Sequence, residues 1–290
     1  MKRLDRSEII FKILSYVLLT IFALCCLYPF LFILSNSISG KDAVLQGKVF
    51  FWPIDIQFDT YKYVLESKGF WLSYCNSFFI TMYGTLVSML VAITGAYALS
   101  KTRLMFGRGF NFMLVFTMWF NAGMIPTLQN FLRFNVTNRE MFIIALGFNA
   151  FNIVLLRNYF SGIPTEIEEA ATIDGATEFQ ILTKVYIPMS KSSIVTVAMF
   201  YAVSRWNGYL WAQMLLGQDD QPLTVYIKVT LKTILDQIEQ SGSTDPKLAN
   251  VSTYALQYAF IVCSIIPVII VYPKLQKYFA AGVNVGGVKE

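Results

Sequence analysis

Long apolar stretches alternate with short polar ones along most of the chain. Six of the stretches approach or exceed ~20 residues, the length of an α-helix that crosses a bilayer. We expect membrane-spanning helices at 11–35, 70–100, 109–131, 140–160, 192–216 and 252–273. Because residues 109–160 are rich in Asn and Gly, a total of five or seven spans stays an alternative to six. The predicted fold is therefore all-α, a polytopic membrane protein with one transmembrane domain over residues 1–290.

The composition supports a membrane protein over a soluble one. Of the 290 residues, 56% are hydrophobic and 14% are charged, whereas soluble domains carry about 25% charged residues. So few charges would not solvate a globule of this size. The net charge of +5 is modest, and it needs no nucleic-acid partner to explain it.

The placement of the basic residues predicts the orientation. They gather before the first span, in one short loop after the second, and after the last; the residues are Lys2, Arg3, Arg6, Lys12, Lys101, Arg103, Arg108, Lys274, Lys277 and Lys289. Positive loops stay in the cytoplasm, so both termini are expected there, in agreement with an even number of spans. The loops 36–69 and 217–251 are then extracytoplasmic. The first apolar run is too long for the core of a cleaved signal peptide, and we expect a retained helix.

Two patterns concern helix packing. Small residues recur every fourth position in the second span, at Gly84, Ser88, Ala92, Ala96 and Ser100. This spacing lets helix backbones approach closely in lipid. In the loop 217–251, apolar residues at helical spacing predict a surface helix; they are Leu231, Ile234, Leu235 and Ile238.

The chain lacks the usual chemistry of an enzyme or an ion-coupled carrier. It has no histidine, and its four cysteines fall within predicted spans, where they are expected to be small buried side chains with no metal or disulfide. We therefore expect no catalytic residue and no metal site. Arg205 is the only charge deep inside a predicted span. A proton- or sodium-driven carrier usually places ionisable groups there, although sodium held by backbone carbonyls stays open.

Residues 164–190 form an acidic island between the fourth and fifth spans. Thr165 and Glu168 fit a capping box, and acidic residues fill the first helical turn that follows. Asp174-Gly175 predicts a break, and Thr177 begins a second capped helix that runs to Pro188. Connectors between neighbouring helices usually need about 2–8 residues, and helices that lie on membranes are usually basic. We therefore expect a docking element for a cytoplasmic partner.

The island carries a family resemblance. "EAATIDGATEFQILTKVYIP" resembles the EAA loop of ABC-type importer permeases, with Glu169, Ala170, Ala171, Gly175 and Pro188 in register and two mild aliphatic departures at Val185 and Ile187. Other segments resemble carbohydrate permeases of the maltose-transporter type: "FWP", "DTYKYV", "NSFFIT", "AYALSK", "IPTEIEEAA", "RWNGYLW" and "GGVKE". Within that family the chain is similar to the second permease of the pair and to members that handle oligosaccharides. The resemblance implies the type I importer permease fold.

The resemblance also implies a site and partners. Contact with the ATPase is expected at Glu168, Glu169, Ala170, Ala171, Asp174 and Gly175. The implied partners are a second permease subunit, expected as a heterodimer, a dimer of cytoplasmic ATPase subunits, an extracytoplasmic solute-binding protein, a carbohydrate and the lipid of a bacterial inner cell membrane. No G-x-x-x-x-G-K-[ST] motif occurs in the sequence, so ATP and Mg are expected on the ATPase and no cofactor on this chain. The tail at 286–289 either reaches the ATPase or frays.

Aromatic and amide side chains in the spans are candidates for a sugar pathway. Sugars stack on aromatic faces and hydrogen-bond to amides, and polar groups in lipid must be paired or face water. The candidates are Arg205, Trp206, Asn207, Trp211, Trp119, Asn121, Asn76 and Asn152. Helix packing stays open as an alternative role for each. The resemblance leaves open whether the main sugar site lies in this chain or in its partner permease.

Three functions therefore compete. The first is the permease subunit of an ATP-driven oligosaccharide importer, for which a glycerophosphate-type cargo is an alternative within the same family. The second is an ion-coupled secondary carrier. The third is a membrane-embedded enzyme, which would lack any histidine or intramembrane carboxylate to work with.

Overall fold

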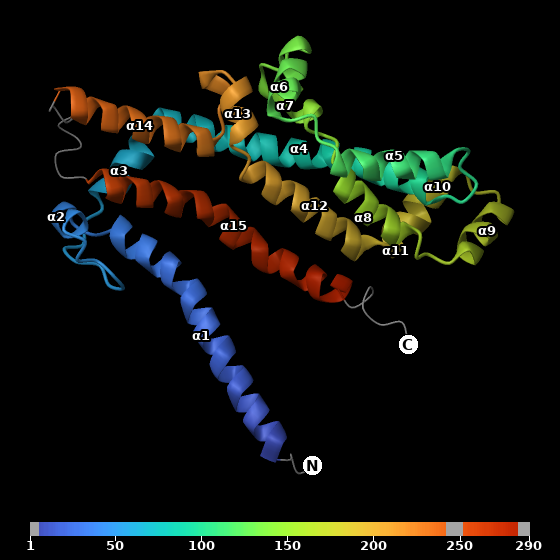
Figure 1. Cartoon of the computed structure of the whole chain (residues 1–290), viewed down its shortest axis with the longest axis horizontal. Coiled ribbons are helices and arrows are strands. Elements are labelled where there is room, and N and C mark those ends of the chain that lie inside the picture. Colours follow the sequence, from blue (N-terminus) through green and yellow to red (C-terminus); the bar gives the residue numbers. More distant parts are fainter. Residues whose placement is uncertain (1–5, 242–251, 284–290) are drawn as a thin grey trace. The chain divides into compact units, whose positions relative to one another are not determined.

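The computed structural model describes residues 6–241 and 252–283, and every regular element in these two ranges is helical (Figure 1). The all-α prediction is thereby confirmed. The contacts divide the chain into two compact units, Met1–Phe70 with Ile227–Pro267, and Trp71–Tyr226 with Val268–Glu290. Residues Lys2, Arg3 and Lys289, the polar loop 242–251 and the tail 286–289 lie outside the described residues.

The first unit contains α1 (Arg6–Ser37), α2 (Lys41–Leu45) and α3 (Asp59–Glu66). The loop expected at 36–69 folds back onto the end of α1. Ser35 Oγ donates a hydrogen bond of 2.7 Å to the carbonyl of Phe51, and Ser37 Oγ lies 2.8 Å from the hydroxyl of Tyr61. Val49 is buried in an apolar cluster beside them. This segment is therefore a folded cap and more than a connector.

The second unit is built on α4 (Lys68–Ser100, from Trp71 onward), α5 (Gly107–Trp119), α8 (Ala150–Phe160) and α12 (Lys191–Trp206). Both α5 and α12 pack against α8. The core between these helices contains Ala92, Ala96, Leu156, Phe160 and Val197. Ala92 and Ala96 are fully buried, which confirms that the small-residue positions of α4 are positions of close packing.

Three of the expected spans are interrupted. The segment 109–131 folds as α5 and α6 (Met124–Arg133), 140–160 as α7 (Arg139–Ala145) and α8, and 192–216 as α12 and α13 (Leu210–Leu215). In the first break, Gly123 has φ of +90° and donates its N–H to Asn121 Oδ1 at 2.9 Å. In the second, Asn149 caps α8 through the N–H of Asn152, and α7 and α8 meet at a bend of 54°. Asn and Gly thus set the breaks through local hydrogen bonding and backbone freedom.

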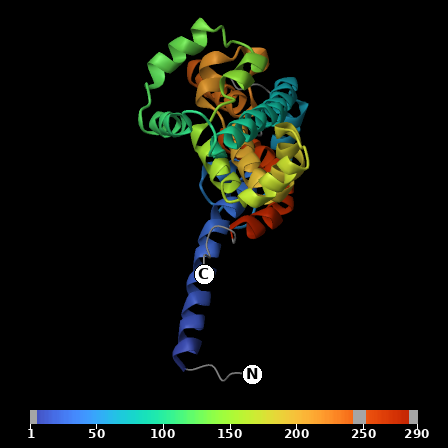
Figure 2. The same ribbon diagram turned by 90° about the vertical axis from the view of Figure 1, so that its right-hand side faces the viewer.

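The remaining helices follow the chain. The acidic island holds α9 (Thr165–Ile173), α10 (Glu178–Ile181), a π-helical turn η1 (Leu182–Tyr186) and α11 (Ile187–Met189), and it lies at one end of the second unit (Figures 1 and 2). After α13 come η2 (Gln218–Asp220), α14 (Leu223–Ser241) and α15 (Thr253–Val283). The helix predicted in 217–251 is confirmed as α14.

Among the described residues, three helices are long and apolar enough to cross a membrane, Ser7–Ser37, Lys68–Ser100 and Thr253–Pro273. The bent pair α7 and α8 would make a fourth span. Broken helices at membrane depth are tolerated where protein satisfies the freed backbone groups. The number of six spans stays a prediction.

The close packing of α4 gives a first test. Ala96→Leu adds three carbon atoms to a position with no free surface, and such overpacking typically costs about 1–3 kcal/mol of stability. Ala98→Leu, on the exposed side of the same helix, is the matched control. Thermal unfolding of the purified chain in detergent should show a lower midpoint for Ala96→Leu alone. Equal midpoints for the two variants would contradict the packing described here.

Candidate functional site

The break in the acidic island is a left-handed turn at Gly175. Gly175 has φ of +78°. Its N–H donates to the carbonyl of Thr172, and the N–H of Ala176 donates to that of Ala171, each at 3.0 Å. These two bonds are the pattern of a Schellman motif, which ends a helix by satisfying its last carbonyls. The predicted break at Asp174-Gly175 is confirmed, and glycine is favoured there because other residues rarely adopt this φ.

The two capping boxes expected in the island have different outcomes. The second is confirmed, because Thr177 Oγ1 accepts from the N–H of Gln180 while the Gln180 side chain accepts from the N–H of Thr177. The first is wrong. Pro164 is the N-cap of α9, and no side chain caps that end. The carboxylate of Glu168 does not turn back to the helix start, because it is bound by groups from another part of the chain.

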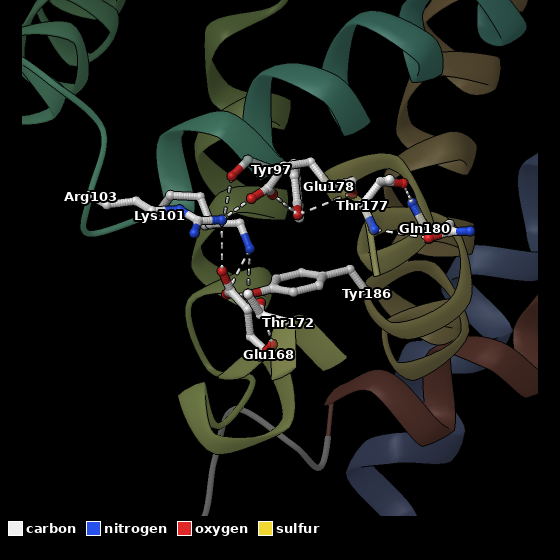
Figure 3. A network of polar contacts seen from close by, with 10 residues as sticks. Tyr97, Lys101, Arg103, Glu168, Thr172, Thr177, Glu178, Gln180 and Tyr186 are labelled. Atoms are coloured by element: carbon white, nitrogen blue, oxygen red, sulfur yellow. Dashed lines mark hydrogen bonds and ion pairs between the residues drawn. The ribbon is translucent and has the colours of Figure 1, made fainter. Parts of the chain in front are cut away.

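Glu168 lies at the centre of a polar cluster that joins the island to the end of α4 (Figure 3). We call this cluster the loop clamp; it consists of Tyr97, Lys101, Arg103, Glu168, Glu178 and Tyr186. Lys101 Nζ lies 2.6 Å from Glu168 Oε2, and the hydroxyl of Tyr186 donates to the same oxygen at 2.7 Å. Arg103 Nη2 lies 3.3 Å from the other oxygen of Glu168.

Two further groups complete the loop clamp. Arg103 forms a close ion pair with Glu178 of α10, and the hydroxyl of Tyr97 donates to Glu178 Oε2 at 2.6 Å. The ammonium of Lys101 also lies over the rings of Tyr97 and Tyr186, with 4.1 and 4.3 Å to their centroids. Both cations come from the short loop after α4. Both carboxylates come from the island, so the clamp fixes the one segment to the other.

The electrostatics of the loop clamp keep Glu168 ionised and Tyr186 protonated at neutral pH. Burial raises the pKa of the Glu168 carboxyl, but the hydrogen bonds from Lys101 and Tyr186 outweigh it and hold that pKa below its ordinary value. Burial and the neighbouring Glu168 raise the pKa of the Tyr186 phenol. Tyr186 therefore stays protonated and remains a donor to the carboxylate.

The other expected coupling residues face solvent. Glu169, Ala170, Asp174 and Gly175 are exposed, and Ala171 is half-buried against the core. Beside them are two large apolar side chains that the sequence analysis did not select, Ile173 and Phe179, with exposed fractions of 86% and 73%. Their signal in the sequence was their apolar character within an acidic segment. The exposed surface of the island thus combines acidic and large apolar side chains.

The expected pathway residues do not gather at one place. Asn76 is buried and donates to the carbonyls of Asp219, at 2.6 Å, and Gln221, at 3.3 Å, while its oxygen accepts from Arg139. Asn152 is buried at the start of α8. The Asn76 amide therefore holds α4 to the segment around η2 and to Arg139 of α7.

The aromatic candidates are spread over three elements. Trp119 ends α5 with 81% of its side chain exposed, close in sequence to Asn121 in the following break. Trp206 packs edge-on against Tyr74, and Trp211 packs edge-on against Phe131. Asn207 is exposed as the C-cap of α12. Of the eight candidates, Trp119, Asn121 and Asn207 are the ones that present an exposed side chain.

Arg205 has an evident structural role. It is only 8% exposed, and its Nη2 donates to Ser88 Oγ at 3.0 Å and to the carbonyls of Ile143 and Leu146. Those carbonyls belong to the last turn of α7, where the bend leaves them without helical partners. A Cβ at Gly84 would lie 3.2 Å from Arg205 Nε, so glycine makes room for the guanidinium. Arg205 therefore secures the break between α7 and α8.

Among the described residues, no group of three or more Cys, Asp or Glu side chains is placed to hold a metal ion. The four cysteines are unpaired there; three are exposed and Cys263 is buried.

Removal of the Arg205 side chain should weaken the fold. Arg205→Met keeps much of the apolar volume but leaves buried carbonyls without donors, at a typical cost of about 1–3 kcal/mol. Arg133→Met, at an exposed position of α6, is the matched control. Thermal unfolding in detergent should separate the two variants, and an unchanged midpoint for Arg205→Met would show that the contact does not secure the break.

The strength of the Lys101–Glu168 ion pair can be tested by a double-mutant cycle. Lys101→Met, Glu168→Gln and the double variant should yield an interaction energy of about 0.5–3 kcal/mol, because both side chains are largely buried. Unfolding in denaturant measures it. Since the pKa of Glu168 is lowered in the folded chain, the ionised pair stabilises at neutral pH, and this contribution is lost as the pH falls through that lowered pKa. An interaction energy that persists in acid would show that the pair is not ionic.

The sequence of the chain matches a known protein family and several of its members over nearly the whole length. The family described as "Binding-protein-dependent transport system inner membrane component" matches residues 2–285. The polygalacturonan/rhamnogalacturonan transport system permease protein YtcP of Bacillus subtilis is 33% identical over 285 residues, which cover 97% of this chain and 98% of that protein. The arabinooligosaccharides transport system permease protein AraQ of Halalkalibacterium halodurans is 27% identical over 287 residues, covering 96% and 97%.

A solved structure is similar as well. A chain in the crystal structure of a bacterial ABC transporter involved in the import of the acidic polysaccharide alginate matches with a TM-score of 0.86 at 48% sequence identity, covering 96% of this chain and 100% of that one. Similarity at this level extends over nearly the whole sequence and includes the acidic island. The chain therefore belongs to the family of binding-protein-dependent transport system inner membrane components, with the fold of an ABC importer permease.

Proposed function

We propose that this chain is a transmembrane subunit of an ATP-driven importer of oligosaccharides that an extracytoplasmic binding protein delivers. Two relatives support the carbohydrate cargo by what their own names state, polygalacturonan/rhamnogalacturonan and arabinooligosaccharides. The alginate transporter structure, at 48% identity, adds an acidic polysaccharide. Alginate and polygalacturonan are both built of uronic acids, so the cargo class proposed here is a uronate-containing oligosaccharide.

The proposal places the acidic island in the cytoplasm, with both termini on that side of a bacterial inner membrane. The basic loop that carries Lys101, Arg103 and Arg108 supports this orientation. The same loop binds the island through the loop clamp, so the two must share one side of the membrane. The observation that carries the proposal is this pairing, in which an acidic docking segment is fastened to the positive loop that marks the cytoplasm.

The island then serves as the contact with a dimer of ATPase subunits, which hold ATP and Mg. Glu169 and Asp174 would accept charge-assisted hydrogen bonds from basic groups of the ATPase. The exposed apolar side chains of Ile173 and Phe179 would fill a hollow on that partner. A second permease subunit completes the pore, as a heterodimer. This chain holds no cofactor of its own in the proposal.

The substrate pathway is proposed along the candidates whose side chains are exposed. Trp119, Asn121 and Asn207 are exposed, so they offer an aromatic face and amide groups to a passing sugar. Trp206 and Trp211, which are half-buried, would add aromatic surface to the pathway. Arg205 and Asn76 would support the wall of the pathway from behind, because their polar groups already bind the backbone or neighbouring side chains. Asn152, which is buried at the start of α8, would lie behind the wall as well.

Uptake tests this function. Cells with and without the chain are given fluorescent uronate oligosaccharides, neutral oligosaccharides and a glycerophosphate ester as competitor, and the chain is purified to identify what accompanies it. The expected result is uptake of the acidic sugar and co-purification of an ATPase and a second permease. Competition by the phosphate ester alone would assign the glycerophosphate cargo. A requirement for sodium or protons with no ATPase would establish a secondary carrier.

Gly175→Val should uncouple transport from ATP hydrolysis. A β-branched side chain at φ of +78° strains the turn between α9 and α10 and misplaces the docking surface. Oligosaccharide uptake should fall about 5- to 150-fold, the range that a coupling free energy of about 1–3 kcal/mol spans. Gly217→Val is the matched control, because Gly217 has an ordinary φ of −65° and open space around it. Normal stimulation of ATP hydrolysis in Gly175→Val would refute the coupling role.

A further inference from the structure

A basic hollow lies next to the loop clamp and shares Lys101 with it. Its volume is about 510 Å³, and it is lined by the end of α4, the loop, the first turns of α5 and one residue of α8. The polar side chains in its wall are those of Ser100, Lys101, Thr102, Arg108, Asn111 and Arg157, and none of its lining residues is acidic. The hollow therefore offers donors and positive charge.

The cations of the wall differ in what they contact. Lys101 is neutralised by Glu168 in the loop clamp. Arg108 and Arg157 form no ion pair with any carboxylate of the described residues. Two positive charges in the wall thus have no carboxylate partner among the described residues, which leaves them available to an anion.

Arg157 is held in place for such an anion. Its Nε donates to the carbonyl of Leu99 at 3.4 Å, and its Nη1 donates to Asn158 Oδ1 at 3.2 Å. These contacts fix the plane of the guanidinium from one side. Asn111 is fixed too, by a bond of 2.8 Å from Nδ2 to the carbonyl of Gly107. Arg157 and Asn111 therefore have set positions in the wall of the hollow.

The backbone at the start of α5 adds to the positive electrostatic potential of the hollow. Gly107 and Arg108 are the first residues of α5, a helix of 13 residues, and both line the hollow. The amino end of a helix carries a partial positive charge and free N–H groups, which favour an anion. Phe106 also lines the hollow with 76% of its side chain exposed, and Met105 before it is equally exposed. Large apolar side chains beside a polar hollow suit a ligand with a charged head and an apolar tail.

We propose that this hollow binds the phosphate of an anionic phospholipid headgroup from the cytoplasmic leaflet, with Arg108 and Arg157 as its ligands. The proposal takes the orientation of this end of the molecule from the proposed function. Arginine suits the role because its planar fork donates two parallel hydrogen bonds to phosphate oxygens. Basic hollows between helices on the cytoplasmic side are typical sites for such headgroups. A bound lipid would also brace the loop that contributes Lys101 and Arg103 to the loop clamp.

The test measures lipid binding to the purified chain by native mass spectrometry, with phosphatidylglycerol and phosphatidylcholine as probes. Phosphatidylglycerol should bind more tightly. Arg108→Gln/Arg157→Gln should weaken its binding roughly twenty-five-fold, from a factor of about five for each basic side chain. Arg108→Gln alone, at an exposed position that is not needed for packing, should weaken it about fivefold. Arg133→Gln, an equal loss of charge on α6 outside the hollow, should leave it unchanged.

Two other kinds of outcome contradict the proposal: one shows that the bound phosphate is not that of a lipid, and the other shows that there is no anion site. If inorganic phosphate protects the wild-type chain from unfolding and phosphatidylglycerol shows no preference, the site takes a free anion and the lipid assignment is overturned. The site itself is overturned if Arg133→Gln weakens phosphatidylglycerol binding as much as Arg108→Gln does. It is also overturned if the chain neither prefers phosphatidylglycerol over phosphatidylcholine nor is protected from unfolding by inorganic phosphate. None of these readouts involves uptake or ATP hydrolysis, so failure here leaves the proposed importer function standing, and a failed uptake assay leaves lipid binding measurable.

Discussion

The contact between Lys101 and Glu168 is the constraint on which the arrangement of the docking segment depends. The island is a pair of short helices, and helices of this length are marginal without packing partners. Its inner side packs on the core through Ala171 and Ile181, but apolar contacts alone fix no single orientation. A buried carboxylate that accepts from an ammonium and a phenol at once has few alternative geometries. The loop clamp therefore gives the island one position relative to α4.

A second constraint acts on the interrupted helices of the second unit. Each break frees backbone groups that lipid would not satisfy. At the bend between α7 and α8, the Asn149 side chain accepts from a free N–H at the start of α8. Arg205 donates to a free carbonyl at the end of α7. The small residues of α4 make this possible, because Gly84 and Ser88 leave space and a hydroxyl for the guanidinium. The same four-residue spacing thus serves close packing at Ala92 and Ala96 and a polar connection one turn earlier.

The sequence predicted features that depend on neighbours along the chain. The Gly175 turn and the Thr177 capping box are of this kind, since their donors and acceptors lie within five residues of one another. The Thr165–Glu168 box failed because Lys101, 67 residues away in sequence, competes for the same carboxylate. The role of Arg205 was hidden for the same reason: its partners come from α4 and α7. The basic loop was noticed for its charge and its side of the membrane, and nothing local indicated its ion pairs with the island.

Glu168 and Glu169 show how one short helix separates two roles. Consecutive residues of an α-helix point about 100° apart, as 3.6 residues per turn requires. Glu168 therefore faces Lys101 and is largely buried, while Glu169 faces solvent. A carboxylate that fastens the helix must be satisfied within the chain, and one that meets a partner must stay unsatisfied until the partner arrives. Adjacent acidic residues on a helix meet both conditions, and this is a physical reason for an acidic island to be denser in glutamate than capping alone would require.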